Sequence, residues 1–315
     1  MKRAFIFPGQ GSQSVGMGQA LAASFPQARQ TFEEVDDALS QKLSTLMWEG
    51  PLDELTLTAN AQPALMAVSL AAMRVLAAEA GLDLVKHASF VAGHSLGEYS
   101  ALAAAGSLSV SDTAKLLRIR GNAMQSAVPV GKGAMAALLG LEFDDAAKIA
   151  AEAAQGEVCD AANDNGGGQV VVSGSKAAVE RAIDLAQERG AKRAIMLPVS
   201  APFHSALMAP AAEVMREALS NATIKAPVVP VVINVEARPV TDPEVIRDAL
   251  VRQVTGTVRW RESMLEMAHE GVESFYEVGS GKVLTGLVKR IAPNATGMAI
   301  GTPDDIAAFV AAFKE

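Results

Sequence analysis

The stretch SFVAGHSLGEYSALAAAG, residues 89–106, places a serine between two glycines where an apolar run meets an alanine-rich run. Gly93-His94-Ser95-Leu96-Gly97 fits the nucleophile elbow, a sharp turn between an entering strand and a departing helix. Glycine is needed on both sides because larger side chains would collide across the turn. The N-terminus of the helix would favour an oxyanion developing at Ser95. Ser95 is therefore a candidate nucleophile, with a purely structural turn as the alternative.

Short apolar segments alternate with helical patterns on both sides of this turn. The alternation predicts an α/β fold with a mostly parallel sheet covered by helices. Pro63 is expected in the first turn of a helix that is apolar nearly all round and therefore buried. Strands are predicted at residues 3–7, 87–93, 226–235, 273–279 and 296–302, and helices at 62–81, 96–108, 112–128, 242–254, 261–271, 281–291 and 304–313.

Residues 133–199 have a different order of elements, β-α-β-β-α-β, which is that of a ferredoxin-like unit. Its strands are predicted at 133–141, 157–163, 168–175 and 191–200, and its helices at 144–155 and 176–190. We therefore predict two units. Residues 1–127 and 200–315 form a large α/β-hydrolase-like domain, and residues 128–199 form an inserted ferredoxin-like α+β subdomain.

The composition limits the class of protein. Of the 315 residues, 50% are hydrophobic and 20% charged, which predicts a compact globular chain. A single cysteine excludes a disulfide framework and fits a reducing compartment. The net charge of −8 argues against nucleic acid as a partner. No segment approaches the roughly 18 uncharged apolar residues of a membrane span, so we expect a cytoplasmic chain, and nothing suggests an obligate oligomer.

A nucleophilic serine needs a base. His204, in LPVSAPFHSALM, follows a predicted strand end, where catalytic groups collect in open α/β sheets. A packed or capping histidine is the alternative. The other three histidines have structural explanations: His87 at the surface, His94 pointing away from its neighbour Ser95, and His269 near a helix C-terminus.

The third member of a catalytic triad is not evident from the residues. Asp160 and Asp164 are candidates only because they lie near a loop. The glycine-rich loop PGQGSQSVGMG, residues 8–18, has Ser14 where a dinucleotide-binding fingerprint needs glycine, and it lacks the Gly-Lys-Ser/Thr of a phosphate loop. It is expected to bring backbone N–H groups close to another group. No metal-ligand cluster is visible.

Several motifs in one order give a more specific indication. They are FPGQGSQ (7–13), GHSLGEYSAL (93–102), NDNGGGQVVVSG (163–174), PFHSALM (202–208), IRDALVRQV (246–254) and EVGSGKVLTGL (277–287). The chain resembles the malonyl-CoA:acyl carrier protein transacylase family from residue 4 to residue 300. Ser280 departs from the family, which commonly has proline at this position.

The resemblance implies a role for each matching residue. Ser95 would be the nucleophile, His204 its general base, and Gln253 the residue whose main-chain carbonyl orients the histidine. Arg120 would bind the free carboxylate of the malonyl group through its planar fork of donors. The remaining matches are Gln10 and Leu96, with oxyanion-hole N–H groups, Asn163 near the entrance, and Phe203, which accompanies malonyl over methylmalonyl selection.

The implied activity is a ping-pong transfer. Malonyl-CoA would acylate Ser95, and the phosphopantetheine thiol of an acyl carrier protein would then take the malonyl group, with no metal or other cofactor. Because such carriers are acidic, a local basic patch is expected; its candidates are Lys192, Arg193, Lys282, Lys289 and Arg290. Three alternatives stay open: a polyketide-pathway malonyl acyltransferase, a serine thioesterase or esterase, and a non-catalytic docking protein. The elbow alone cannot separate transfer from hydrolysis.

Overall fold

The computed structural model describes residues 1–199 and 201–313 and has a mixed α/β architecture with two sheets. The larger sheet has the strand order β10-β9-β1-β2-β7-β8. Its strands are parallel except β8, which pairs antiparallel with β7 at one edge. The bounds are β1 (Lys2–Phe7), β2 (Phe90–Gly93), β7 (Val231–Ile233), β8 (Arg238–Val240), β9 (Val272–Val278) and β10 (Thr296–Ile300).

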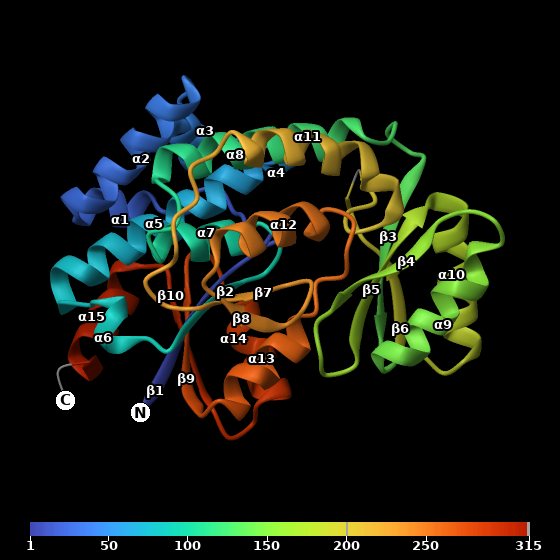
Figure 1. The fold of residues 1–315 in the computed structure, drawn as a ribbon. Helices are drawn as coiled ribbons and strands as arrows, with labels where there is room; N and C mark the ends of the chain where they lie inside the picture. Colours follow the sequence, from blue (N-terminus) through green and yellow to red (C-terminus); the bar gives the residue numbers. More distant parts are fainter. Residues whose placement is uncertain (200, 314–315) are drawn as a thin grey trace.

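Helices cover both faces of this sheet (Figure 1). One face packs against α2 (Pro26–Leu39), α5 (Thr58–Ala80), α7 (Gly97–Ala104), α8 (Val110–Ser126) and α15 (Pro303–Phe313), and the other against α13 (Trp260–His269) and α14 (Val283–Ile291). The remaining helices of this unit are α1 (Gln19–Ser24), α3 (Leu43–Glu49), α4 (Leu52–Thr56), α6 (Leu84–His87), the 3-10 turn η1 (Ala206–Met208), α11 (Ala209–Ser220) and α12 (Pro243–Gln253).

The first strand explains why the sheet has two apolar faces. Successive side chains of a strand point to opposite faces. Phe5 and Phe7 therefore enter the core with α2, α5 and α7, whereas Ala4 and Ile6 enter the core with α13 and α14. All four are fully buried, which is why residues 4–7 form a continuous apolar run rather than an alternating one.

The second sheet is antiparallel and lies at one end of the molecule (Figure 1). Its strand order is β4-β5-β3-β6. The predicted β-α-β-β-α-β order is the order observed, with its own core of small apolar side chains. The elements are β3 (Gly133–Leu139), α9 (Phe143–Ala154), β4 (Cys159–Asp164), β5 (Gln169–Ser175), α10 (Lys176–Glu188) and β6 (Arg193–Met196).

A backbone connection joins the two units at β4. Val258 donates its N–H to the carbonyl of Ala162 at 2.9 Å and accepts from the N–H of Asp164 at 3.0 Å. Arg261 adds an ion pair of 2.9 Å to the buried carboxylate of Asp164. The end of β4 is thereby tied to the segment that leads into α13, which fixes the wall of the groove between the units.

The bounds of several predicted elements differ, and the structure shows the reason for two of them. The long apolar helix begins at Thr58, so Pro63 lies inside it rather than in its first turn. The helix starts earlier because Leu57 accepts hydrogen bonds from Asn60 and Ala61. The strand predicted from His87 begins at Phe90 instead, since residues 84–87 form the short helix α6 under an Asp83 cap.

Some elements were not predicted at all. They include the helices α1 to α4 and α11, the 3-10 turn η1 and the strand β8. The strand predicted at residues 226–235 is shorter than expected, since β7 has three residues between Pro230 and Asn234. Ser200, the first residue of the second large-domain segment and the last of a predicted strand, lies outside the described residues.

The helix α5 has the length and mean hydropathy of a membrane span, contrary to the expectation that no segment approaches one. However, 83% of its most apolar window is buried inside the protein. It packs against α2 and α8 on the larger sheet, as the core helix of a globular protein does.

Candidate active site

The serine lies on a strained turn between β2 and α7. Ser95 has φ +54°, a left-handed conformation that side chains other than glycine rarely adopt. A Cβ on Gly93 would lie 1.9 Å from the backbone carbon of Gly97, and a Cβ on Gly97 would lie 2.3 Å from the carbonyl oxygen of Phe7. Glycine is therefore required at both positions, as the elbow motif predicts.

His204 is the partner of Ser95. The Ser95 Oγ lies 2.8 Å from His204 Nε2, and His204 Nδ1 lies 2.8 Å from the main-chain carbonyl oxygen of Gln253. With Nδ1–H donating to that carbonyl, Nε2 is free to accept the serine proton. His204 itself has φ +56°, so both members of the pair have left-handed backbones. The predicted pair is brought together.

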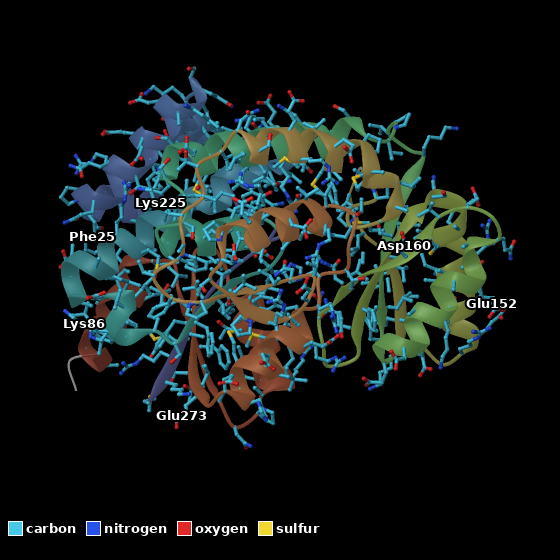
Figure 2. All side chains as sticks on the ribbon, in the orientation of Figure 1. Phe25, Lys86, Glu152, Asp160, Lys225 and Glu273 are labelled. Carbon is cyan, nitrogen blue, oxygen red and sulfur yellow. The ribbon has the colours of Figure 1, made fainter. Side chains whose placement is uncertain are left out.

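Neither candidate acid contacts His204. Asp160 accepts the backbone N–H of Ala206 at 2.8 Å, and Asp164 pairs with Arg261. In Figure 2, Asp160 lies on the side of the smaller unit that faces the larger sheet, whereas Glu152 lies on its outer side. A neutral carbonyl therefore occupies the place of the usual carboxylate.

Burial determines the protonation of His204. His204 is 4% exposed, and desolvation lowers its pKa to about 3, assisted by the nearby charge of Arg120. The imidazole is therefore neutral at neutral pH, which is the form that can accept a proton from serine.

Arg120 completes the constellation from α8. Its guanidinium donates to Ser95 Oγ at 3.1 Å and to the side-chain oxygens of Gln62 and Gln253 at 2.7 and 2.8 Å. The side chain is 1% exposed, and burial lowers its pKa from the usual value. Within the described residues no carboxylate lies within ion-pair distance of it. A buried cation without an anion in contact is suited to receive one from a ligand.

Three residues that the sequence analysis did not select support this arrangement. Asn234, just after β7, accepts the N–H of Ser95 at 2.8 Å and donates to the carbonyl of Gly93 at 2.8 Å. Gln62 positions Arg120, and Glu98 accepts from Asn234 N–H and Gln253 Nε2. The signal available in the sequence was a polar residue within an apolar segment: Asn234 in VVINV and Glu98 in the alanine-rich helix after the elbow. Such residues are expected to be hydrogen-bonded when they are buried.

Ser95 and His204 line a cavity of about 530 Å³ between the two units. Gln10, Leu96, Asn163 and Phe203 all line it, as does Ser95. Among the described residues no acceptor binds the backbone N–H of Gln10 or Leu96. Both are therefore available to a ligand oxygen. Asn163 is 6% exposed on β4, next to the junction with Val258.

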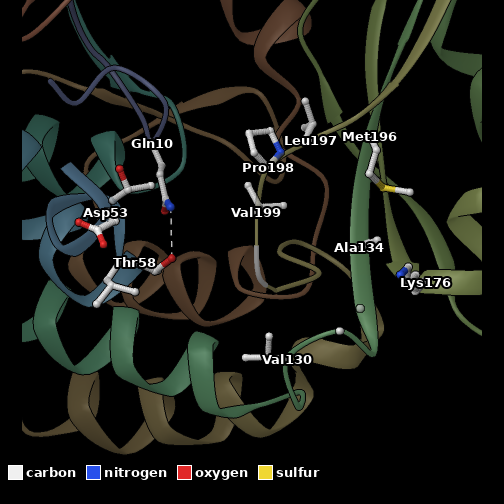
Figure 3. Close-up of a pocket in the computed structure, with 14 residues that line it drawn as sticks. Gln10, Asp53, Thr58, Val130, Ala134, Lys176, Met196, Leu197, Pro198 and Val199 are labelled. Carbon is white, nitrogen blue, oxygen red and sulfur yellow. Dashed lines mark hydrogen bonds between the residues drawn. The ribbon is translucent and has the colours of Figure 1, made fainter.

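A second cavity of about 460 Å³ adjoins the first (Figure 3). The two share Gln10, Thr56 and residues 197–199 as lining. Gln10 Nε2 donates to Thr58 Oγ1 at 3.2 Å on one wall, and Met196, Ala134 and Lys176 lie on the opposite wall (Figure 3). Together the cavities form a long groove suited to an extended ligand.

The other histidines have structural contacts. His94 Nε2 lies 2.8 Å from Asn165 Oδ1, and its ring packs on Trp260 rather than against Ser95. His87 ends α6, and His269 ends α13 with an exposed side chain. No group of three or more His, Cys, Asp or Glu side chains within residues 1–199 and 201–313 could hold a metal ion.

The basic candidates are all exposed. Lys192 and Arg193 precede or begin β6, and Lys282, Lys289 and Arg290 belong to the α14 region. Ser280, the departure from the family pattern, donates to the carbonyl of Ser12 at 2.8 Å and joins two loops near the cavity. Among the described residues it makes no hydrogen bond to Ser95 or His204.

Comparisons with known proteins agree with this geometry. The acyl transferase domain family matches residues 4–300. The malonyl CoA-acyl carrier protein transacylase of Escherichia coli K12 is 50% identical over 305 residues, covering 97% of both chains. The structure of an acyl-carrier-protein S-malonyltransferase from Bartonella henselae superposes with a TM-score of 0.97 at 56% identity over 100% of both chains. A malonyl-transacylase solved in complex with a type II polyketide acyl carrier protein gives 0.95 at 42%, covering 99% of this chain and 100% of that chain.

Proposed function

Since the chain belongs to the acyl transferase family, and within it to the malonyl-CoA:acyl carrier protein transacylases, we propose that Ser95, His204 and Arg120 carry its reaction. The chain transfers a malonyl group from malonyl-CoA to acyl carrier protein in fatty acid synthesis. The observation that carries the assignment of residues is the contact of Ser95 Oγ with both His204 Nε2 and the buried guanidinium of Arg120.

In the first half-reaction Ser95 attacks the thioester carbonyl of malonyl-CoA. His204 Nε2 takes the serine proton and delivers it to the departing CoA thiolate, and the Gln253 carbonyl supports the imidazolium. The backbone N–H groups of Gln10 and Leu96 stabilise the tetrahedral oxyanion, aided by the N-terminus of α7.

Arg120 selects the acyl group. Its fork donates two parallel hydrogen bonds to the malonyl carboxylate, whereas an acetyl group would leave the buried cation unpaired. Phe203, which is 8% exposed at the cavity wall beside His204, limits the width available to a branch on the acyl chain. Asn163 lies at the cavity wall on β4, where it borders the acyl chain.

In the second half-reaction the phosphopantetheine thiol of the carrier attacks the malonyl ester, with His204 as base. A histidine supported by a carbonyl gains less imidazolium stabilisation than one supported by a carboxylate, which suits exchange between thioesters over activation of water. The alternatives are transfer to a polyketide carrier protein and hydrolysis by a thioesterase. The first is supported by the complex of a similar malonyl-transacylase with a type II polyketide acyl carrier protein.

The finer architecture belongs to the same proposal. Residues 1–127 and 200–315 would form an α/β-hydrolase-like domain, and residues 128–199 an inserted ferredoxin-like subdomain, with the reaction in the groove between them. In this proposal the protein acts as a monomer in the cytoplasm, binds no nucleic acid or membrane and needs no cofactor. An acidic carrier would dock on the exposed cations Lys192, Arg193, Lys282, Lys289 and Arg290.

The test is intact-mass spectrometry after mixing with malonyl-CoA. We expect one malonyl group on Ser95, removed rapidly by carrier protein and slowly by water. His204→Ala should slow acylation. Fast loss of the malonyl group to water would indicate a thioesterase, and a bare Ser95 would contradict the proposal altogether.

A further inference from the structure

Glu98 is a buried carboxyl group in the first turn of α7, three residues after Ser95. It is 1% exposed. One oxygen, Oε2, accepts from the backbone N–H of Asn234 at 2.9 Å and from Gln253 Nε2 at 3.0 Å. The other oxygen, Oε1, is buried and has no partner among the described residues. Oε2 therefore accepts two hydrogen bonds, and Oε1 accepts none from the described residues.

Glu98 is linked to Arg120 through one side chain. Gln253 accepts from Arg120 with its Oε1 at 2.8 Å and donates to Glu98 with its Nε2. Among the described residues no carboxylate touches Arg120. Tyr99 and Glu98 act on it electrostatically, and Glu98 is the carboxyl group of the two. With Glu98 ionised, its negative charge balances the positive charge of Arg120, and the buried region has no net charge from these two residues before substrate binds.

The substrate carboxylate disturbs this balance. A malonyl group bound at Arg120 adds a second negative charge, and an uncompensated buried charge is costly. A proton on Oε1 would restore neutrality without breaking a bond, because both bonds of Glu98 are accepted by Oε2. Desolvation raises the pKa of Glu98 to about 7, so such a proton is exchangeable near neutral pH.

We propose that binding of the malonyl carboxylate at Arg120 is coupled to uptake of one proton from solvent by Glu98. The proton forms an O–H bond at Oε1 and returns to solvent when the malonyl group leaves with its acceptor. The inference rests on the proposed role of Arg120 as the carboxylate receptor. It deepens that role by giving the site a proton-linked affinity for its anionic substrate.

Other charged groups near Glu98 do not replace it. Arg120 on α8 and Arg252 on α12 act on it electrostatically, and Tyr99 follows it on its own helix. His204 and Tyr99 are the other titratable groups close to Arg120, and burial raises the pKa of Tyr99 above its usual value. The remaining charged groups of the elements packed on α7 are exposed or have other contacts: Arg74 with Glu34, Lys2 with Glu270, Arg3 over Phe313, Arg118 with Asn60, and exposed Glu79, Asp112 and Lys115.

The direct test is calorimetry of malonyl-CoA binding to Ser95→Ala, which cannot be acylated. Titrations in two buffers with different ionisation enthalpies give the number of protons taken up. We expect about 0.9 proton at pH 8, where free Glu98 is ionised, and about 0.1 at pH 6. Above pH 7 the Kd should rise by about tenfold per pH unit. Acetyl-CoA, which carries the same CoA and no free carboxylate, should take up none.

Glu98→Gln in the same background separates charge from framework. Its carbonyl oxygen can keep both accepted bonds, and its amide nitrogen occupies the vacant side. We expect no proton uptake and an affinity independent of pH. Glu277→Gln is the matched control, because Glu277 is another fully buried glutamate, which instead accepts from Leu284 and Thr285 in α14. It should leave the uptake unchanged.

Proton uptake that persists in Glu98→Gln would assign the proton to His204 and overturn the inference. Absence of proton uptake in the parent Ser95→Ala protein would also overturn it. If Glu98→Gln does not fold, infrared difference spectra of the parent decide, since a protonated carboxyl band must appear with malonyl-CoA and not with acetyl-CoA. Unchanged malonyl-CoA affinity in Arg120→Ala would instead contradict the role of Arg120. Lost affinity there, with no uptake in the parent, would refute only the coupling.

Discussion

Replacing Arg120 by alanine tests the basis of acyl selection. The guanidinium makes three hydrogen bonds, to Ser95 Oγ, Gln62 and Gln253, and is 1% exposed. In the variant a malonyl carboxylate would enter the same buried cavity without a cation. Removing one partner of a buried, hydrogen-bonded charge pair costs about 2–5 kcal/mol. Since about 1.4 kcal/mol is a factor of ten, kcat/KM for malonyl-CoA should fall roughly 30- to 5,000-fold.

Acetyl-CoA should respond differently. The wild-type protein leaves Arg120 unpaired when an acetyl group is bound, and the alanine variant removes that buried charge. Acetyl transfer should therefore stay constant or rise, so that the ratio of malonyl to acetyl transfer falls by orders of magnitude. The assay is initial-rate transfer from each thioester to the same carrier protein, followed by intact mass of the carrier.

Arg118→Ala is the matched control on the same helix. Arg118 donates to Asn60 and Gln41 on the surface side of α8 and does not line the catalytic cavity. It should leave both rates near wild type. Equal losses of malonyl and acetyl transfer in Arg120→Ala, with an unchanged thermal midpoint, would refute the carboxylate role and leave Arg120 as a support for Ser95.

Three further variants probe the turn and the base. In Gly97→Ala the added Cβ would lie 2.3 Å from the Phe7 carbonyl oxygen, so urea unfolding should show a loss of roughly 3 kcal/mol or more; a wild-type midpoint would contradict the required close approach. Gln253→Ala keeps the main-chain carbonyl that binds His204 but loses the side-chain hydrogen bonds to Arg120 and to the carbonyl of Ser95, so kcat should fall roughly tenfold to a hundredfold. An unchanged kcat would show that only the main chain of Gln253 contributes to the reaction. His204, with its pKa lowered to about 3, stays neutral in the folded state while the unfolded chain gains a proton below pH 6.5. Its contribution to stability is therefore complete above pH 6.5 and falls as pH drops toward 3; His204→Gln should weaken this dependence in urea titrations, and an equal slope would argue for an ordinary pKa.

The parallel sheet was predictable from the alternation of strand and helix patterns and from the burial of β1 on both faces. Residues 4–7 form a fully buried apolar run in β1, whereas Glu273, Ser274 and Glu277 interrupt the apolar residues of β9, which was predicted from its place in the alternation. The antiparallel unit was predictable from its order of elements. The helices of residues 19–56 were not predicted. α1, α3 and α4 have only five to seven residues each, and α2 buries Ala28, Phe32 and Val35 where it packs on α5 and α8.

The site was predictable where chemistry restricts the residue type. Ser95 was identified from its flanking glycines and His204 from its position after a strand, while the pairing of His204 with the Gln253 carbonyl came from the family resemblance. Asn234 and Gln62 escaped prediction because an amide side chain in an apolar segment has no distinctive spacing. The role of Asn234 depends on its loop lying beside the turn after β2, and that of Gln62 on α5 lying beside α8, which a local pattern does not encode.

The strain at Ser95 and His204 explains why so many buried amides surround them. Left-handed backbones at Ser95 and His204 cost of order 1–3 kcal/mol each and persist only where the surroundings over-determine them. The Ser95 N–H is held by Asn234 and its carbonyl by Gln253, so both polar groups of the strained residue have side-chain partners. Gln253 also orients His204 through its own carbonyl. Asn234 and Gln253 therefore hold Ser95, His204 and Arg120 in one geometry, and we expect a change in either amide side chain to alter the positions of all three.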